Sequence, residues 1–157
     1  MEKTNVMRVL DSKKVAYKSH CYVQSGAVGV KEVAVVLNQD PKRLFKTLVT
    51  IGKTNNHYVF VVPGDSELDL KKAAKAVGEK NIEMIKQKDL LPLTGYIHGG
   101  CSPVGMKKLF KTTFDITALD YPAIFFSAGK IGYQVEMNIE DLKKVIPFNL
   151  VDLKEEE

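Results

Sequence analysis

The sequence predicts an α+β domain with a central mixed or antiparallel sheet surrounded by helices. Short apolar segments come in pairs separated by turns, 44–51 with 58–62 and 123–127 with 132–137, which is typical of β-hairpins. Helical patterns lie between them in irregular order, whereas a doubly wound parallel fold alternates strands and helices regularly. The 157 residues, 45% hydrophobic and 27% charged, suit one globular domain and exclude disorder, collagen-like repeats and a disulfide scaffold.

The first part of the chain is predicted to form helix, strand, helix and a short helical turn. Apolar residues share one face in 4–13, and side chains alternate between two faces in 15–23. A second helix is predicted over 30–37, where apolar residues recur at i, i+3, i+4 and i+7. Asp40 followed by Pro41 predicts an N-cap and one further helical turn.

The middle of the chain is dominated by the hairpin of 44–51 and 58–62, whose two arms are unusually apolar. A helix follows over 68–77, with lysines on its outer face. A short strand over 82–85 and one helical turn over 89–93 come next. The residues of the 68–77 helix expected to face inward are Leu70, Ala73, Ala74 and Val77.

The last part contains the second hairpin and a final helix. Strands are predicted over 123–127 and 132–137, and Asn138 is placed to cap the helix that follows. We expect residues 1–153 to form a single domain and residues 154–157 to be a frayed acidic tail.

Charge and composition exclude some classes of protein. Lys and Arg number 23 against 19 Asp and Glu, and the net charge of +4 permits an anionic partner without demanding one. No apolar run approaches the roughly 20 residues of a membrane span, and no signal-peptide pattern follows Met1. We therefore expect a cytoplasmic protein without membrane contact. Cys21 and Cys101 lie far apart and are expected to be free thiols.

Three motifs that suggest a function are more simply structural. Segment 52–54 reads Gly-Lys-Thr, but it lacks the first glycine of a P-loop, since residue 47 is threonine, and it lies between strands. Segment 129–132 reads Gly-Lys-Ile-Gly like the loop of KH domains, but that loop joins helices and this one joins strands. The spacing of the three histidines fits no metal site, and we expect no metal and no cofactor. These histidines are His20, His57 and His98.

Two features are less readily explained by structure alone. Lys46 lies in the middle of an apolar strand; either it reaches water at a strand edge, or its ammonium binds an anion. Segment 99–105 contains three glycines, a serine and a proline, and is either a rigid loop or a cradle of backbone N–H groups for a phosphate or an oxyanion. Cys101 within it is more simply a small buried residue than a nucleophile.

Three segments occur in a specific order and spacing. Segment 45–49 reads Phe-Lys-Thr-Leu-Val, 99–105 reads Gly-Gly-Cys-Ser-Pro-Val-Gly, and 127–132 reads Ser-Ala-Gly-Lys-Ile-Gly. Together they resemble the YbaK-type aminoacyl-tRNA deacylases, also called YbaK/prolyl-tRNA-synthetase-associated domains. Segments 68–72 and 95–96 support the resemblance, which covers nearly the whole chain.

The resemblance implies an α+β fold whose central mixed sheet is curved like a partial barrel. It also implies a freestanding homologue of the editing domain inserted in bacterial prolyl-tRNA synthetases. The implied activity is the removal in trans of a mischarged amino acid from the tRNA 3′ end. That amino acid is cysteine on the proline tRNA in YbaK proper, and alanine or another small amino acid in related branches. The implied partners are the aminoacyl-tRNA acceptor end and prolyl-tRNA synthetase, while the oligomeric state stays open.

The resemblance implies a site without a protein nucleophile. Lys46 takes the catalytic position, where the lysine of the family helps to hold the acceptor end and the ester. The substrate's own thiol attacks its ester carbonyl and leaves as a cyclic thiolactone, while the protein supplies orientation and charge stabilisation. The implied substrate-binding residues are Tyr22, Thr47, Gly99, Gly100, Ser102, Pro103, Gly105, Ser127 and Gly129.

The chain departs from the family pattern at Gln134, where relatives often carry an acidic residue, and at Ala128 and Ile131. If that acid helps the thiol to lose its proton, Gln134 favours another small amino acid such as alanine. Gln134 also motivates an alternative, a non-catalytic tRNA- or synthetase-binding module. The lysines at 71, 72 and 75 could serve such a module, although a solvated helix face is their default interpretation.

Overall fold

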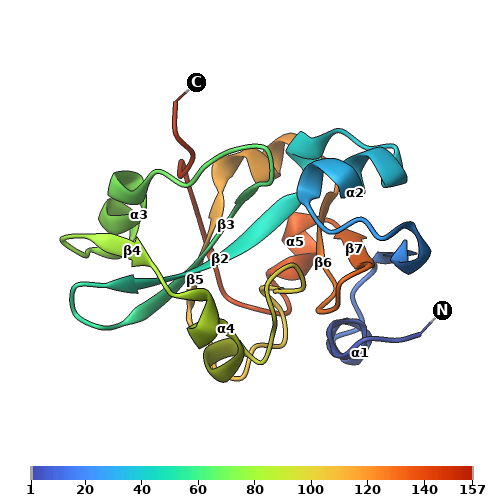
Figure 1. Cartoon of the computed structure of the whole chain (residues 1–157), viewed down its shortest axis with the longest axis horizontal. Helices are drawn as coiled ribbons and strands as arrows, with labels where there is room; N and C mark the ends of the chain where they lie inside the picture. Colours follow the sequence, from blue (N-terminus) through green and yellow to red (C-terminus); the bar gives the residue numbers. More distant parts are fainter. Residues whose placement is uncertain (1, 157) are drawn as a thin grey trace.

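Eight strands, five α-helices and three 3₁₀ helices make up the computed structural model, which describes residues 2–156 (Figure 1). The strands are β1 (Lys18–Cys21), β2 (Phe45–Gly52), β3 (His57–Pro63), β4 (Ile82–Met84), β5 (Lys111–Asp115), β6 (Ile124–Ser127), β7 (Tyr133–Met137) and β8 (Asn149–Val151). The helices are α1 (Asn5–Ser12), α2 (Val30–Leu37), α3 (Leu70–Val77), α4 (Gln87–Thr94), α5 (Ile139–Leu142), η1 (Val23–Ser25), η2 (Pro41–Arg43) and η3 (Ile116–Asp120).

The strands form two sheets. One is antiparallel throughout, with the order β1-β7-β6. The other has the order β4-β2-β3-β5-β8; it is antiparallel from β4 to β3 and parallel from β3 to β8. A parallel bridge between Leu44 and Phe125 joins the sheets, which do not close into a barrel. The predicted α+β class and the mixed strand directions are therefore confirmed, and the central sheet is divided in two.

Both faces of the five-stranded sheet are covered, which explains why the hairpin of β2 and β3 is apolar throughout. Every side chain of β3 from Tyr58 to Val62 is buried. Successive side chains of a strand point to opposite faces, so β3 serves two cores. Val59 and Val61 pack in the core shared with the other sheet, and Phe60 packs on the opposite face with Ala73 of α3.

Capping side chains begin three of the helices, and the caps at Asp40 and Asn138 are the ones that the sequence predicts. Asp40, Asp69 and Asn138 each accept a hydrogen bond from the backbone N–H two residues further on, at the starts of η2, α3 and α5. α4 is longer than the single predicted turn and tolerates Pro92 in its second half, ending at Gly95, whose φ is +85°. Left-handed backbone of this kind is typical of glycine at a helix end.

The structure differs from the sequence prediction at several elements. The predicted strand 15–23 is shorter, because the chain turns into η1 after β1. β5 and β8 were not predicted, since β5 reads Lys-Thr-Thr-Phe-Asp and β8 has only three residues. Leu70, expected to face inward, is 41% exposed at the start of α3, where Ala73 and Ala74 make the buried contacts.

The acidic C-terminal segment is paired, not frayed, as far as Glu156. Lys154 forms an antiparallel bridge with Leu68 just before α3. Lys72 Nζ donates to the Lys154 carbonyl at 2.8 Å and to a Glu156 carboxylate oxygen at 2.9 Å. Lys72 therefore holds the end of the chain against α3. This contact joins residues more than eighty positions apart, so the sequence pattern does not predict it.

Candidate functional site

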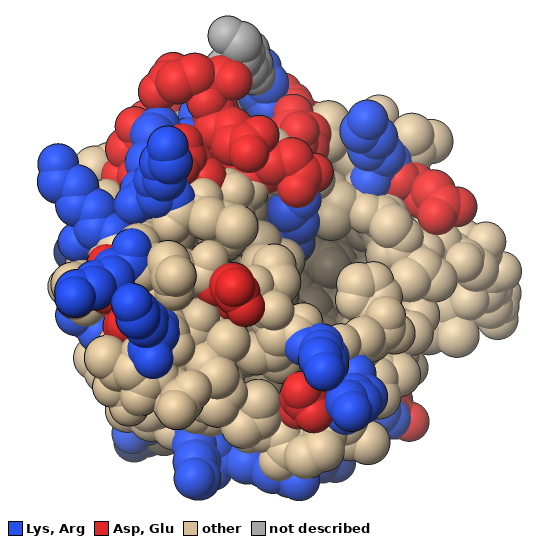
Figure 2. Space-filling view, turned by 60° about the vertical axis from the view of Figure 1, so that its left-hand side comes forward, with Lys and Arg blue, Asp and Glu red and all other residues tan. Residues whose placement is uncertain are grey.

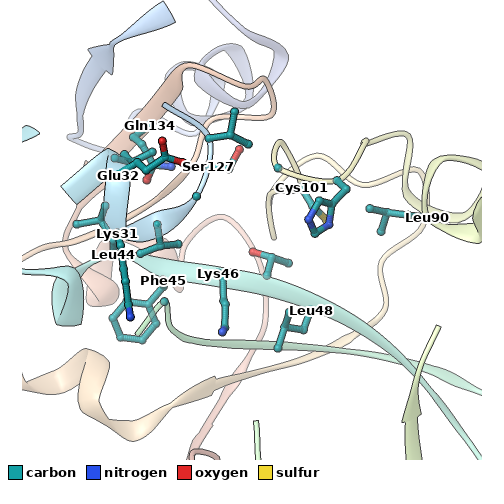
Figure 3. Close-up of a pocket in the computed structure, with 18 residues that line it drawn as sticks. Lys31, Glu32, Leu44, Phe45, Lys46, Leu48, Leu90, Cys101, Ser127 and Gln134 are labelled. Atoms are coloured by element: carbon teal, nitrogen blue, oxygen red, sulfur yellow. The ribbon is translucent and has the colours of Figure 1, made fainter. Parts of the chain in front are cut away.

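A cavity of about 500 Å³ lies where four parts of the chain meet. They are the start of α2, the first half of β2, the segment 98–101 and the β6–β7 hairpin. Figure 2 looks onto a hollow in a largely uncharged surface, with a basic side chain at its upper edge, and Figure 3 shows the residues that line the pocket. Its volume is in the range of pockets that bind small molecules.

The pocket exists because the two sheets separate beside β2. They are bridged at Leu44, and β4 pairs with β2 only from Thr50 to Gly52 in the part of the chain that the structure describes. On this edge the Val49 carbonyl accepts the N–H of Ile85 at 3.3 Å. Alternate residues of a strand direct their backbone groups to the same edge, so the N–H and carbonyl of Thr47 also point to this open edge.

Lys46 lies on this open strand and lines the pocket (Figure 3). Its side chain is 25% exposed, and its Nζ lies 3.8 Å from Oε1 of Glu67, whose own side chain is 79% exposed. An ion pair this long and this exposed contributes little to stability. Lys46 therefore both lines a pocket and reaches a solvent-exposed carboxylate, and anion binding by its ammonium stays a prediction.

A group of neutral polar side chains forms another wall. Ser127 and Gln134 face each other across the β6–β7 pair, and both line the pocket. Gln134 Nε2 donates to the Tyr22 hydroxyl at 3.4 Å, while Gln134 Oε1 and Thr47 Oγ1 are buried without a hydrogen-bond partner among residues 2–156. Ser127 Oγ accepts the N–H of Gly129 at 3.0 Å, which leaves its own proton free to donate.

The predicted site residues fall into two groups. Lys46, Thr47, Gly99 and Ser127 line the pocket. Tyr22 lies one hydrogen bond behind it, at Gln134, and burial raises the pKa of its hydroxyl, which therefore stays protonated. The other five are not among the lining residues; they are Gly100, Ser102, Pro103, Gly105 and Gly129.

Ser102 and Gly105 support the loop from behind. Ser102 is fully buried, and its Oγ accepts the N–H of Val104 at 3.3 Å. The Tyr96 hydroxyl donates to the Val104 carbonyl, and a Cβ at Gly105 would lie 2.8 Å from that hydroxyl. The glycine-rich segment thus supports the pocket wall, and Gly105 is required for close packing against Tyr96.

Gly105→Ala is expected to lower the free energy of unfolding by about 2–3 kcal/mol, since it combines a left-handed backbone with a collision. Gly105 has φ +81°, and Gly78 at the end of α3 has φ +76° but no atom within 4 Å of the position that a Cβ would take. Gly78→Ala is therefore a matched control that reports backbone strain alone. Urea denaturation of both variants measures the difference, and equal losses would show that the Tyr96 contact is unimportant.

Cys101 lines the pocket as a buried thiol, as the sequence analysis favoured. Burial raises its pKa to about 12, so the thiol is neutral at physiological pH and is not an activated nucleophile. We expect iodoacetamide to modify the native protein only at the exposed Cys21, and Cys101 only after unfolding. Mass spectrometry of wild type and Cys21→Ser checks this, and rapid labelling of native Cys21→Ser would contradict it.

Sequence reasoning did not identify Lys31, Glu32 or His98 as pocket residues, yet all three line it. Lys31 and Glu32 belong to the first turn of α2, and His98 immediately precedes the glycine-rich segment. The local sequence carries one weak indication that the start of α2 belongs to a site. The helix begins with Gly-Val-Lys-Glu, and Gly29 has no side chain to cap it. Their proximity to β2 depends on long-range packing.

Two kinds of feature are missing from the described part of the chain. Residues 2–156 contain no group of three His, Cys, Asp or Glu side chains that could hold a metal ion. The same residues contain no helix with the length and apolar character needed to cross a bilayer.

The fold and the pocket define a class: an α+β domain that offers an anionic ligand a lysine, free backbone groups and hydroxyls. The chain belongs to the aminoacyl-tRNA editing domain family, since residues 24–145 match the sequence model of that family.

Two curated relatives share substantial identity with the chain. A protein of Enterococcus faecalis named "Putative Cys-tRNA(Pro)/Cys-tRNA(Cys) deacylase EbsC" is 49% identical over 137 residues, which are 87% of this chain and 84% of that protein. A proline–tRNA ligase of Thermodesulfovibrio yellowstonii is 36% identical over 107 residues, which are 68% of this chain and 18% of the ligase. The chain thus corresponds to most of the first relative and to one part of the second.

Two solved structures share the fold at low sequence identity. A hypothetical protein superposes with a TM-score of 0.88 at 21% identity, covering 98% of this chain and 100% of that one. A protein described as "a putative trans-editing enzyme for prolyl tRNA synthetase" superposes with a TM-score of 0.83 at 23% identity, covering 99% and 100%. The two-sheet arrangement is therefore found in experimental structures.

Proposed function

We propose that the chain is a trans-editing aminoacyl-tRNA deacylase that removes a mischarged amino acid, foremost cysteine on the proline tRNA, from the tRNA 3′ end. The observation that carries the proposal is the pocket beside Lys46. It combines a cation with free backbone groups and hydroxyls, and its wall contains an inert thiol instead of an activated nucleophile. The name of the 49% identical relative supports the same substrate.

The pocket suits a reaction in which the substrate provides the nucleophile. The cysteine thiol loses its proton and attacks the ester carbonyl; the new C–S bond closes a thiolactone, and the C–O bond to the terminal ribose breaks. The leaving ribose oxygen takes up a proton, so atoms and charge balance. In this proposal Lys46 holds the anionic acceptor end, and the Thr47 N–H on the open edge of β2 donates to the developing oxyanion; their position at the pocket supports these roles.

Release of ³⁵S-cysteine from Cys-tRNA for the proline tRNA tests the proposal. We expect the wild-type protein to accelerate release strongly, and Ser-tRNA to react far more slowly, because a hydroxyl is a weaker nucleophile than a thiol. Ala-tRNA, which lacks an internal nucleophile, is the third substrate. Preferential release of alanine would instead assign the chain to the branch of the family that clears alanine. No release from any of the three tRNAs would overturn the enzymatic proposal.

A second candidate function rests on Gln134. Without an acidic residue at this position the chain could bind tRNA or a synthetase and not turn over. Prolyl-tRNA synthetase is the partner that fits, since part of a proline–tRNA ligase resembles this chain. Such a module would bind uncharged and charged tRNA equally and release no amino acid. We place either function in the cytoplasm, where aminoacyl-tRNAs are used.

A further inference from the structure

The pocket is chemically different on its two sides. In Figure 3 the nitrogen ends of Lys31 and Lys46 extend to one side of the β2 ribbon, and Glu32 lies toward Ser127 and Gln134 on the other. Glu32 is the only carboxylate among the described residues that line the pocket. Its side chain makes no ion pair with any Lys or Arg in residues 2–156. A ligand bound here meets positive charge on one side and negative charge on the other.

The acidic side of the pocket also has hydrogen-bond acceptors without donors. Gln134 Oε1 and Thr47 Oγ1 are buried and have no partner among residues 2–156. The Thr47 carbonyl points to the open edge of β2, because it shares the direction of the Val49 carbonyl two residues further on. Buried acceptors in folded proteins are nearly always hydrogen-bonded, so two without a partner at a pocket indicate a place for a ligand's donor.

We infer that this acceptor side recognises the free α-ammonium group of the aminoacyl ester, with Glu32 as its counter-ion. An ammonium carries three N–H donors and a positive charge. Glu32, Gln134 and Thr47 offer it one carboxylate and two unpaired oxygens. The lysine side would hold the terminal nucleotide, so the two charges orient the ester in the pocket. This inference rests on the proposed function and narrows its substrate to esters with an unmodified amino group.

Glu32 could also serve only to stabilise the start of α2, and the test must distinguish this structural role from ligand binding. Glu32 is in the first helical turn after Gly29, where a carboxylate interacts favourably with the helix N-terminus. Glutamine serves this position nearly as well as glutamate in capping boxes. Glu32→Gln therefore removes the charge and leaves the helix start intact, and its thermal unfolding midpoint should stay within about 2 °C of wild type.

An amide-linked analogue of the substrate tests recognition without turnover. The probe is 3′-alanylamino-3′-deoxyadenosine, and its N-acetyl derivative lacks the charge and two of the three donors. Calorimetric titration of the wild-type protein should show about tenfold or greater preference for the free amine, the size expected for a charged hydrogen bond. In Glu32→Gln the preference should fall to about twofold or less. Glu83→Gln, an exposed change of equal charge on β4, should keep the wild-type preference.

Three results would overturn the inference: equal binding of the two probes by wild type, an unchanged preference in Glu32→Gln, or no binding of either probe. The deacylation assay separates this inference from the proposed function. If cysteine is released at a rate that does not depend on Glu32, the proposed enzymatic function stands and the proposed ammonium site is refuted. If the preference for the free amine depends on Glu32 but no cysteine is released, the ammonium site stands and the enzymatic function is refuted.

A second readout follows from the same geometry. Aminoacyl-tRNAs whose amino group is acylated, such as N-acetyl-cysteinyl-tRNA, should be deacylated about tenfold more slowly than the free form by wild type. Glu32→Gln should slow the free form and leave the acylated form unchanged. A loss that is equal for both forms would indicate a purely structural role for Glu32.

Discussion

Lys46→Ala should lower kcat/KM for cysteine release by about 10² to 10³, the usual effect of deleting one preorganised group that stabilises transition-state charge. Lys46 lies in the first half of β2 and lines the pocket, and its ammonium has only a long ion pair with the exposed Glu67. It is therefore available to an anionic substrate. The measurement is the initial rate of ³⁵S-cysteine release at substrate concentrations below KM.

Two comparisons keep this result interpretable. Lys53→Ala changes an exposed lysine in the turn between β2 and β3 and should leave the rate unchanged. The unfolding midpoint of Lys46→Ala should match wild type, because exposed ion pairs contribute about 0–1 kcal/mol. A rate loss below about threefold would remove Lys46 from the proposed role.

Asp115→Ala should lower the free energy of unfolding by about 3 kcal/mol or more, the largest stability effect that we expect. Asp115 ends β5 with none of its surface exposed. One carboxylate oxygen accepts the N–H of Leu153 at 2.8 Å, and the other accepts the N–H of Thr117 at 3.1 Å. Alanine would leave these two N–H groups, and the Thr117 hydroxyl that also donates to the carboxylate, without their acceptor, and would detach the C-terminal segment from the sheet.

Urea denaturation measures this loss, and Asp120→Ala provides the control, since Asp120 is exposed in η3 on the same stretch of chain. Asp115→Asn should cost less than alanine, because its one amide oxygen can still accept some of the three hydrogen bonds that the carboxylate accepts. Similar stabilities for Asp115→Ala and Asp120→Ala would show that the buried carboxylate does not hold the C-terminal segment.

The sequence pattern predicts the elements that are stabilised by interactions between residues close together in the chain. The β2–β3 hairpin and the caps at Asp40 and Asn138 depend on neighbours in the chain, and they form where expected. β5 depends on pairing in parallel with β3, which precedes it by about fifty residues. Its Thr112 and Thr113 are buried by that pairing, although their sequence is typical of a solvated segment. Composition alone does not indicate such burial.

The same distinction applies to the pocket. Lys46 was identified because a lysine in an apolar strand is anomalous within its own sequence. Glu32 was missed, since a charged residue in the first turn of a helix is ordinary and only tertiary packing brings it to the open edge of β2. Ser102 and Gly105 belong to a recognisable motif but support the wall from behind. A sequence motif can therefore mark the scaffold of a site as readily as its lining.

The buried thiol of Cys101 has a consequence for oxidative damage. The proposed cysteine substrate would bring a second thiol close to that of Cys101, and a disulfide between them would block the pocket. Disulfide exchange and peroxide oxidation both proceed through the thiolate. Burial raises the pKa of Cys101 to about 12, so its thiolate is scarce at neutral pH. The pocket should therefore stay open under oxidising conditions that inactivate enzymes with thiolate nucleophiles.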